Sequence, residues 1–319
     1  MTSEDSLYSI GDSSIDTALV GFTKPPFGYY GAKQRMATKI IASLPPHNAW
    51  VEAFCGSAAI TLAKPAAPIE VINDLDGNVT NVFEQLRTNP EALCKAVALT
   101  PYSRQEFEAA RNGTPSQDPL ERARQFLVAT MMTVNSTIAT KSSCGFSYSQ
   151  SFARGGMEAR VSRWFNLPER LVHVAERLRT IRIEKRDARD LVRLFADRPA
   201  TLMYLDPPYF VKRRHGYTID AKDEPFHRDL LKLCSRSKAM ILISGYRNKV
   251  YDSILTKKNG WYRTTIDTHT RDTTGKDYAR TEILWRNSQF MEARKTGKLQ
   301  LRLTKLEIKE NKINPARKG

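Results

Sequence analysis

The chain has 319 residues, enough for one large domain or two smaller ones, each with a sizeable core. It carries 50 Lys and Arg against 34 Asp and Glu, which gives a net charge of +16. So large an excess is better explained by a polyanionic binding partner than by a need for solubility alone. No apolar run approaches the ~18–20 residues of a membrane span, and no signal segment precedes the first elements. The four cysteines and five histidines are scattered, so we expect a cytoplasmic protein with no metal site and no membrane association.

The first part of the chain combines an acidic leader with a glycine-containing turn. Residues 1–20 hold acidic side chains and no Lys or Arg, which is typical of a flexible leader outside the fold. An aromatic and small-residue segment, residues 27–33, then precedes a helix expected over residues 35–44. Lys33 is expected near the amino end of this helix, with Tyr29 just before the small residues. A plain connection from loop to helix is the alternative interpretation.

Two strands with polar ends follow. Residues 49–60 predict an apolar strand that turns through Gly56 and Ser57 into a helix of small residues. This geometry presents backbone N–H groups and the amino end of the helix to an anion or carboxylate. Residues 69–74 predict a second strand that ends in Asp74, roughly 20 residues beyond the glycine turn, the spacing of an acid that binds ribose hydroxyls. Asp76 is the second candidate for this role, and an acidic helix cap is the alternative.

The parallel-sheet pattern is interrupted between residues 78 and 175. Helices are predicted over residues 79–86, 91–99, 103–111 and 120–134, and a polar, aromatic segment over residues 135–156. Arginines mixed with aromatic residues suit phosphate contacts, base-edge contacts and wedging into a duplex. A helical lid with a solvated charged face is the alternative. The nucleic-acid contacts expected here are Arg104, Arg124, Lys141, Arg154 and Arg163.

The sheet pattern then resumes and leads to the most informative turn of the chain. A strand over residues 181–184 is followed by Asp187, either a ligand-binding acid or a surface helix cap. An apolar strand over residues 201–205 is stopped by Asp206-Pro207-Pro208-Tyr209, because proline has no N–H for a ladder. A carboxylate, a carbonyl and an aromatic ring at a strand's carboxyl end suit a planar group with an exocyclic amino group, such as a nucleobase. The basic loop after it, with Lys212 and Arg213, is expected to contact a nucleic-acid backbone. Three further strands are predicted over residues 239–244, 261–265 and 281–285.

These motifs, in this order, resemble a known family. Asp206-Pro207-Pro208-Tyr209 resembles the catalytic motif of S-adenosylmethionine (SAM) enzymes that methylate amino groups, and Phe54-Cys55-Gly56-Ser57 resembles their Phe-x-Gly-x motif. Together with Tyr29 and Lys33 they make the chain similar, from about residue 25 to 286, to Dam-like (D12-class) DNA adenine-N6 methyltransferases, in detail to phage-type members.

The resemblance implies an α/β fold, a Rossmann-like SAM-dependent methyltransferase sheet with a helical target-recognition insert. The SAM-binding catalytic domain would comprise residues 21–77 and 176–286, the insert residues 78–175, and a basic tail residues 287–319. In this family the aromatic residue and the lysine contact the methionine end of SAM, here Tyr29 and Lys33. The other cofactor-binding residues implied are Phe54, Gly56, Ser57, Asp74 and, toward the adenine N6 of SAM, Asp187.

The expected reaction is methyl transfer to adenine N6 in duplex DNA. Asp206 and the Pro207 carbonyl would accept the two N6 hydrogens, and the base would be flipped out and stacked on Tyr209. Cytosine-N4 methylation, RNA adenine methylation and a non-catalytic DNA-binding protein on the same fold are the alternatives. Double-stranded DNA is the expected partner, with a cognate restriction endonuclease as a further candidate. The recognition site GATC follows from the resemblance alone, and a monomer is the default.

Overall fold

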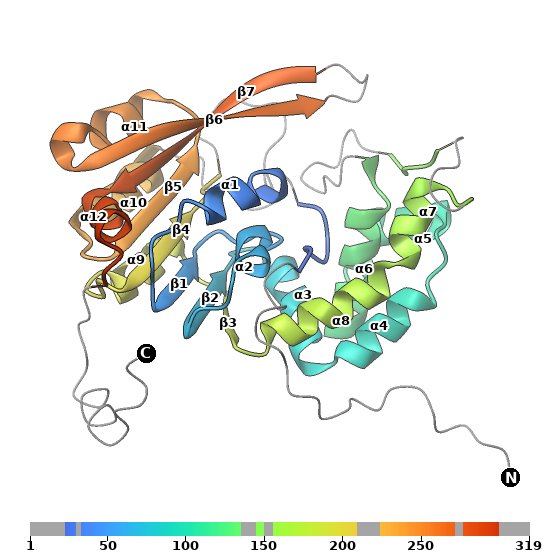
Figure 1. Cartoon of the computed structure of the whole chain (residues 1–319). Coiled ribbons are helices and arrows are strands. Elements are labelled where there is room, and N and C mark those ends of the chain that lie inside the picture. Colours follow the sequence, from blue (N-terminus) through green and yellow to red (C-terminus); the bar gives the residue numbers. More distant parts are fainter. Residues whose placement is uncertain are drawn as a thin grey trace, which may run out of the picture.

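One mixed sheet organises the molecule. The computed structural model describes residues 23–29, 33–134, 145–149, 156–208, 224–271 and 277–299, and within them seven strands form a sheet in the order β3-β2-β1-β4-β5-β7-β6 (Figure 1). The strands from β3 to β5 are parallel, whereas β7 is antiparallel to β5 and to β6. The strands are β1 (Ala49–Glu52), β2 (Ile69–Asn73), β3 (Ile181–Glu184), β4 (Thr201–Leu205), β5 (Met240–Gly245), β6 (Trp261–Arg271) and β7 (Asp277–Asn287).

Helices cover both faces of this sheet. Strands β1, β4 and β5 are buried along their whole length, which explains their continuous apolar sequence. Side chains alternate between the faces: Trp50 and Leu202 pack in one cluster, and their neighbours Val51 and Met203 pack in the other. The first face is covered by the 3-10 helix η1 (Lys33–Arg35), α1 (Ala37–Ile41), α2 (Ala59–Ala63) and α12 (Ser288–Thr296). The second face is covered by α9 (Ala188–Phe195), α10 (Glu224–Arg236) and α11 (Lys249–Ile254), and a further 3-10 helix, η3 (Lys257–Asn259), precedes β6.

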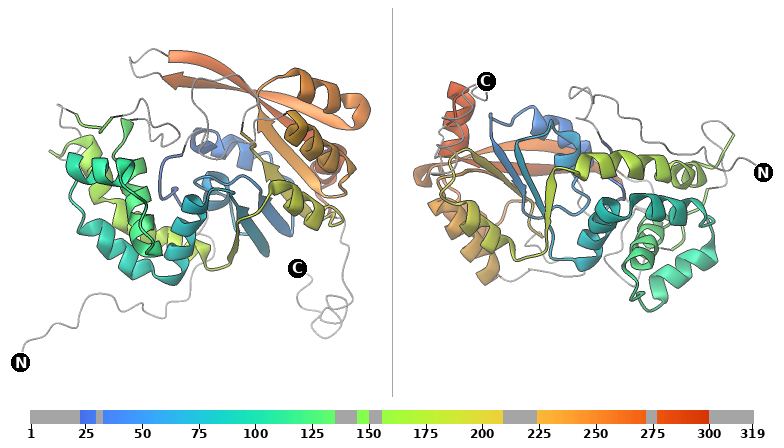
Figure 2. Two further views of the ribbon diagram at one scale, coloured as in Figure 1. Left: turned by 180° about the vertical axis from the view of Figure 1, so that it is seen from behind. Right: turned by 90° about the horizontal axis from the view of Figure 1, so that it is seen from below.

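A helical unit is inserted between β2 and β3. Figures 1 and 2 show its helices gathered on one side of the molecule, beside the edge of the sheet that β2 and β3 form. Its core is continuous with the sheet, because Ile72 of β2 and Ile181 of β3 belong to the same apolar cluster as the helices. The helices are α3 (Gly77–Thr88), α4 (Pro90–Ala98), α5 (Arg104–Asn112), α6 (Pro119–Met131), α7 (Ala159–Phe165) and α8 (Leu167–Leu178).

The first four inserted helices confirm the sequence-based predictions, whereas α7 and α8 were not predicted. The sequence does carry a signal for α8, because Leu167, Leu171, Val174 and Leu178 recur at helical spacing and are all buried. A buried ion pair fixes α8 to the sheet: Arg177 of α8 donates through Nη2 to Glu70 of β2 over 2.8 Å. The insert is therefore anchored to the strand that ends at the proposed ribose-binding acid.

Residues 287–319, which the sequence predicts to form a basic tail, begin with a helix that packs on the sheet. Asn287 accepts from the backbone N–H of Phe290 over 3.1 Å and so caps α12. The Phe290 side chain is fully buried against the sheet, so the tail begins with a packed helix. Residues 1–20 and 300–319 lie outside the described residues. None of the described helices has the length and apolar character needed to cross a membrane.

Candidate active site

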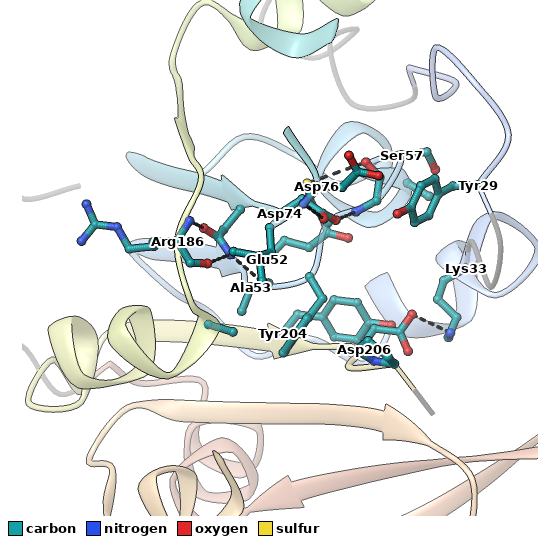
Figure 3. Close-up of a pocket in the computed structure, with 18 of the residues that line it drawn as sticks. Tyr29, Lys33, Glu52, Ala53, Ser57, Asp74, Asp76, Arg186, Tyr204 and Asp206 are labelled. Carbon is teal, nitrogen blue, oxygen red and sulfur yellow. Dashed lines mark hydrogen bonds and ion pairs between the residues drawn. The ribbon is translucent and has the colours of Figure 1, made fainter. Parts of the chain in front are cut away.

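A pocket opens at the carboxyl ends of β1, β2 and β4. Its volume is about 880 Å³, including the open space at its mouth. In open α/β sheets this is the edge at which ligands bind. In Figure 3, Tyr29, Ser57, Asp74 and Asp76 line one side, and Lys33, Tyr204 and Asp206 line the other. Among the predicted site residues, those that line the pocket are Tyr29, Lys33, Phe54, Gly56, Ser57, Asp74, Asp187, Asp206 and Pro208.

The glycine turn after β1 forms the floor of this pocket. Gly56 has a φ of +47°, a left-handed conformation that favours glycine, and a Cβ at this position would lie 2.5 Å from Cδ1 of Tyr29. Ala58 also has a positive φ, 54°, which is uncommon for a residue with a side chain. The hydroxyl oxygen of Ser57 is buried and has no hydrogen-bond partner among the described residues. The turn thus combines a close approach of backbone and ring with a polar atom that a ligand could satisfy.

Asp74 is held by the backbone of the turn itself. Its carboxylate accepts from Gly56 N over 2.8 Å and from Asp76 N over 2.9 Å. The Gly56 N–H is therefore directed at the carboxylate of Asp74, which itself lines the pocket. Removal from water raises the pKa of Asp74 to about 6, although the two N–H groups act in the opposite direction. Asp76 accepts from Asn78 N over 2.9 Å and caps α3, so the helix-cap interpretation applies to Asp76.

Asp206, at the end of β4, lies in a network of buried partners. Its Oδ2 is 2.6 Å from the Lys33 ammonium, and its Oδ1 accepts from Ser244 over 2.8 Å. Burial lowers the pKa of Lys33, but the carboxylates of Asp206 and Glu282 raise it by more, so the lysine is held in its charged form. Lys33 is thus directed at the proposed catalytic acid. Pro207 lies at the same turn without lining the pocket, and Tyr209 lies outside the described residues.

Comparison with known proteins identifies the family of this chain. The model of the D12 class N6 adenine-specific DNA methyltransferases matches residues 29–269, more than half of the chain. The chain belongs to this family. It is therefore an adenine-N6 DNA methyltransferase, and the cytosine-N4, RNA and non-catalytic alternatives are set aside. No curated protein matches the chain. A solved structure, precorrin 8w decarboxylase from Methanobacterium thermoautotrophicum, is similar at 8% identity over 84% of this chain and 96% of that chain, with a TM-score of 0.35 that is too low for any argument.

Asp187 of this methyltransferase combines a pocket position with a structural role. Its carboxylate accepts from Arg189 N over 2.8 Å, which caps α9, and it pairs with the Arg189 guanidinium over 2.6 Å. These hydrogen bonds lower the pKa of Asp187. The helix-cap interpretation is thereby confirmed, and the contact to the adenine of SAM stays a prediction for a residue that also borders the pocket.

Three polar residues around the pocket were missed at the level of sequence. Glu52, at the end of β1, is buried, accepts from Thr61 N over 3.0 Å, and has its pKa raised to about 7 by burial. Glu282 of β7 lies 3.0 Å from the Lys33 ammonium, and Ser244 of β5 bonds to Asp206. For Glu52 a signal existed, since an acid inside an otherwise apolar strand needs a buried partner. The other two depend on contacts between distant segments.

The predicted DNA contacts have different environments. Arg104 is exposed and lies over the rings of Phe146 and Tyr148, at 5.0 and 5.9 Å from the centroids. Burial lowers the pKa of Arg163, and the neighbouring arginines 160 and 170 lower it further. Arg124, in contrast, pairs with Glu121 over 2.6 Å and with Glu106 over 2.9 Å, and so ties α5 to α6. The structure does not support Arg124 as a phosphate contact. Four further candidates lie outside the described residues, namely Lys141, Arg154, Lys212 and Arg213.

Proposed function

We propose that this enzyme uses SAM to methylate N6 of one adenine, flipped out of duplex DNA, within a specific short sequence. The observation that carries the proposal is the shared pocket of two strand-end acids. Asp74 of β2 and Asp206 of β4 line the same pocket, and the glycine turn of β1 lies with them. Such a pocket can hold a nucleoside at one acid and present a reacting amino group to the other.

The residues on the Asp74 side fit SAM. Asp74 has further lone pairs available for ribose hydroxyls beside the two backbone N–H groups that it accepts. The buried Ser57 hydroxyl has no hydrogen-bond partner within the described part of the chain, and the absence of a Cβ at Gly56 makes room for Tyr29. When bound, SAM supplies a sulfonium methyl group as the electrophile. We propose that Tyr29, Phe54, Gly56, Ser57, Asp74 and Asp187 hold it.

The residues on the Asp206 side suit adenine N6. The N6 lone pair is delocalised into the ring, so the amino group is a weak nucleophile until its hydrogens are held by acceptors. We propose that Asp206 and the Pro207 carbonyl accept them, which favours a pyramidal nitrogen with an exposed lone pair. Lys33 and Ser244 keep the carboxylate of Asp206 in place before the base arrives. Positioning and electrostatics then supply the rate, without a covalent enzyme nucleophile.

The insert would hold the DNA. A duplex buries the amino group of adenine, so the base must leave the stack to reach a pocket of this kind. We propose that Arg104 and Arg163 contact the phosphate backbone, because the first is exposed on an aromatic platform and the second belongs to a cluster of arginines. The net charge of +16 supports a large electrostatic share of the affinity.

The test is incubation of the purified protein with SAM and unmethylated duplex DNA, followed by nucleoside mass spectrometry and sequencing of the modified positions. We expect N6-methyladenine within one short motif. Asp206→Ala is expected to abolish transfer while DNA binding stays within about twofold, since the residue acts on the reacting group and not on the backbone.

Two results would contradict the proposal. Retained turnover in Asp206→Ala would exclude the role of this acid, and absence of any transfer from SAM by the wild-type protein would exclude SAM as the donor. We also propose a cognate restriction endonuclease as a partner, and the motif found by sequencing makes this testable. A cognate endonuclease would cut the unmethylated motif and spare the methylated one.

A further inference from the structure

The Lys33 ammonium lies between two carboxylates that come from different strands. Asp206 Oδ2 is 2.6 Å away and Glu282 Oε1 is 3.0 Å away. The side chains of Lys33 and Glu282 are both only 5% exposed, and that of Asp206 is 14% exposed. Lys33 and Asp206 line the pocket, whereas Glu282 is not among the lining residues. Glu282 therefore reaches the reacting region through Lys33.

The other oxygen of Asp206 is also held. Ser244 donates to Oδ1 over 2.8 Å, and its hydroxyl lies 2.8 Å from the Tyr204 hydroxyl. These contacts follow from the sheet, because β4 and β5 pair in register through Leu205 and Ile243, one residue before Asp206 and Ser244. The direction of the carboxylate is thus set by both oxygens, and Glu282 supports one of the two.

The charges explain why a second acid is useful. Attack of adenine N6 on a methyl group forms an N–C bond, breaks the S–C bond with its electron pair going to sulfur, and places positive charge on N6. The ion pair of Lys33 and Asp206 has no net charge, so by itself it would stabilise the positive charge on N6 poorly. The Lys33 ammonium alone would repel that charge. With Glu282 included, the three side chains carry one net negative charge. The lysine also has an acceptor that does not compete for the base.

We propose that Glu282 is a positioning residue. When the adenine amino group reaches Asp206, the Lys33 ammonium keeps its ion pair with Glu282 and gives up its contact with Asp206. Asp206 is then released to accept the N6 hydrogens, and one proton leaves N6 through this carboxylate to solvent after the methyl group has transferred. This inference rests on the role of Asp206 proposed above. It assigns the third acid of the site to the control of Lys33 and not to the substrate.

The test compares Glu282→Gln, Lys33→Met and the double variant with the wild-type protein. We expect Glu282→Gln to lower kcat by about 10- to 100-fold, by analogy with the loss of a hydrogen-bond partner that orients a metal ligand. KM for SAM and the Kd for duplex DNA should change by less than about threefold, because Glu282 does not line the pocket. The double variant should be no slower than Lys33→Met, since Glu282 acts only through the lysine.

A matched control separates this role from a structural one. Glu70 is also a buried acid paired with a lysine, Lys64, at 2.7 Å, and it bonds to Arg177 as well. Lys64 does not line the pocket, whereas Lys33 does. Glu70→Gln should lower the melting temperature and leave kcat per folded molecule unchanged. Glu282→Asp, which keeps the charge, should recover part of the kcat lost in Glu282→Gln.

The outcomes are distinguishable from failure of the proposed function. Unchanged kcat in Glu282→Gln, or a loss that is additive with Lys33→Met, would overturn the role of Glu282 while the wild-type protein still forms N6-methyladenine. If Glu282→Gln does not fold, Glu282→Asp replaces it. Its shorter side chain should lower kcat by a smaller factor, with no further loss when it is combined with Lys33→Met, and unchanged kcat in Glu282→Asp would then overturn the role. A full loss in Glu282→Asp with intact SAM binding and no coupling to Lys33 contradicts it. Absence of N6-methyladenine with the wild-type protein would instead count against the proposed function.

Discussion

The ring of Tyr29 lies directly against Gly56, so closely that a Cβ on the glycine would be 2.5 Å from Cδ1 of the ring. The glycine also has a φ of +47°. Both the backbone conformation and the absence of a side chain are therefore required at this position. The contact joins Tyr29 to the turn after β1, and so it shapes the side of the pocket where SAM is proposed to bind.

Gly56→Ala is expected to displace Tyr29 and weaken SAM binding. The loss of this ring contact should lower SAM affinity by about 10- to 100-fold, which corresponds to roughly 1.4–2.8 kcal/mol. Isothermal titration calorimetry with SAM measures the change. Gly297→Ala is the matched control, since Gly297 also has a positive φ, +65°, but has open space where the Cβ would lie. It should cost stability and leave SAM binding unchanged. Equal SAM affinity in Gly56→Ala and wild type would contradict the proposed place of the cofactor.

SAM binding should depend on pH through Asp74. The pKa of Asp74 in the free protein is raised to about 6, and ribose hydroxyls are better held by the ionised carboxylate. Affinity should therefore be constant well above pH 6 and fall as the pH drops below it, by up to about tenfold per pH unit. Calorimetric titrations between about pH 5 and 8 provide the measurement. Asp74→Asn should bind weakly at every pH and lose this dependence, whereas Glu52→Gln should keep it. A pH profile that is the same in Asp74→Asn and wild type would assign the effect to another group.

Much of the fold and part of the site could be predicted from the sequence. Apolar runs that end in Asp74 and Asp206 identify the strands, and parallel strands bring such ends to one edge of a sheet. The glycine at the first turn could also be recognised, because a strand followed by glycine and small residues is a local pattern. These features depend on neighbours in the chain, so the sequence contains them directly.

The remaining contacts depend on the register between distant segments. Lys33 lies in η1 and Glu282 in β7. They meet because β7 pairs antiparallel with β5, which places Glu282 beside η1. Arg104 and Arg124 both lie on inserted helices. The spacing of Glu121 and Arg124, three residues apart on α6, is a sequence signal for one ion pair, whereas the contact between Arg124 and Glu106 depends on the packing of α5 on α6. The pair with Glu121 could therefore be predicted from the sequence, and the pair with Glu106 could not.

Glu52 predicts a stability difference that depends on pH. Burial raises its pKa from an ordinary 4.5 to about 7, so the folded state favours the protonated acid. The stabilisation from Glu52 is therefore present below pH 4.5 and is lost as the pH rises through about 7. Glu52→Gln stays neutral and can still accept from Thr61. We expect this variant to gain, relative to wild type, about 2–3 kcal/mol in free energy of unfolding between pH 5 and pH 8.

Urea unfolding of both proteins across this pH range measures the difference. Asp74 contributes equally to both proteins, so its titration cancels in the comparison. A constant difference between the two proteins at all pH values would show that Glu52 does not titrate in this range. A gain for wild type at high pH would reverse the sign and would mean that the ionised acid is the stabilised form.

Replacement by alanine should have different effects at Arg124 and Arg163: the first should lower stability, and the second should lower DNA affinity. Arg124→Ala leaves Glu106 and Glu121 without their shared partner, so we expect a loss of about 1–3 kcal/mol in unfolding free energy and little change in DNA affinity. Arg163→Ala removes one member of an arginine cluster. It should weaken DNA binding at low salt and reduce the slope of log K against log salt by about one. Fluorescence anisotropy with a labelled duplex at several salt concentrations, together with urea unfolding, measures both effects. If Arg124→Ala were to reduce the salt slope with unchanged stability, Arg124 would contact DNA after all, and its carboxylate partners would have to release it on binding.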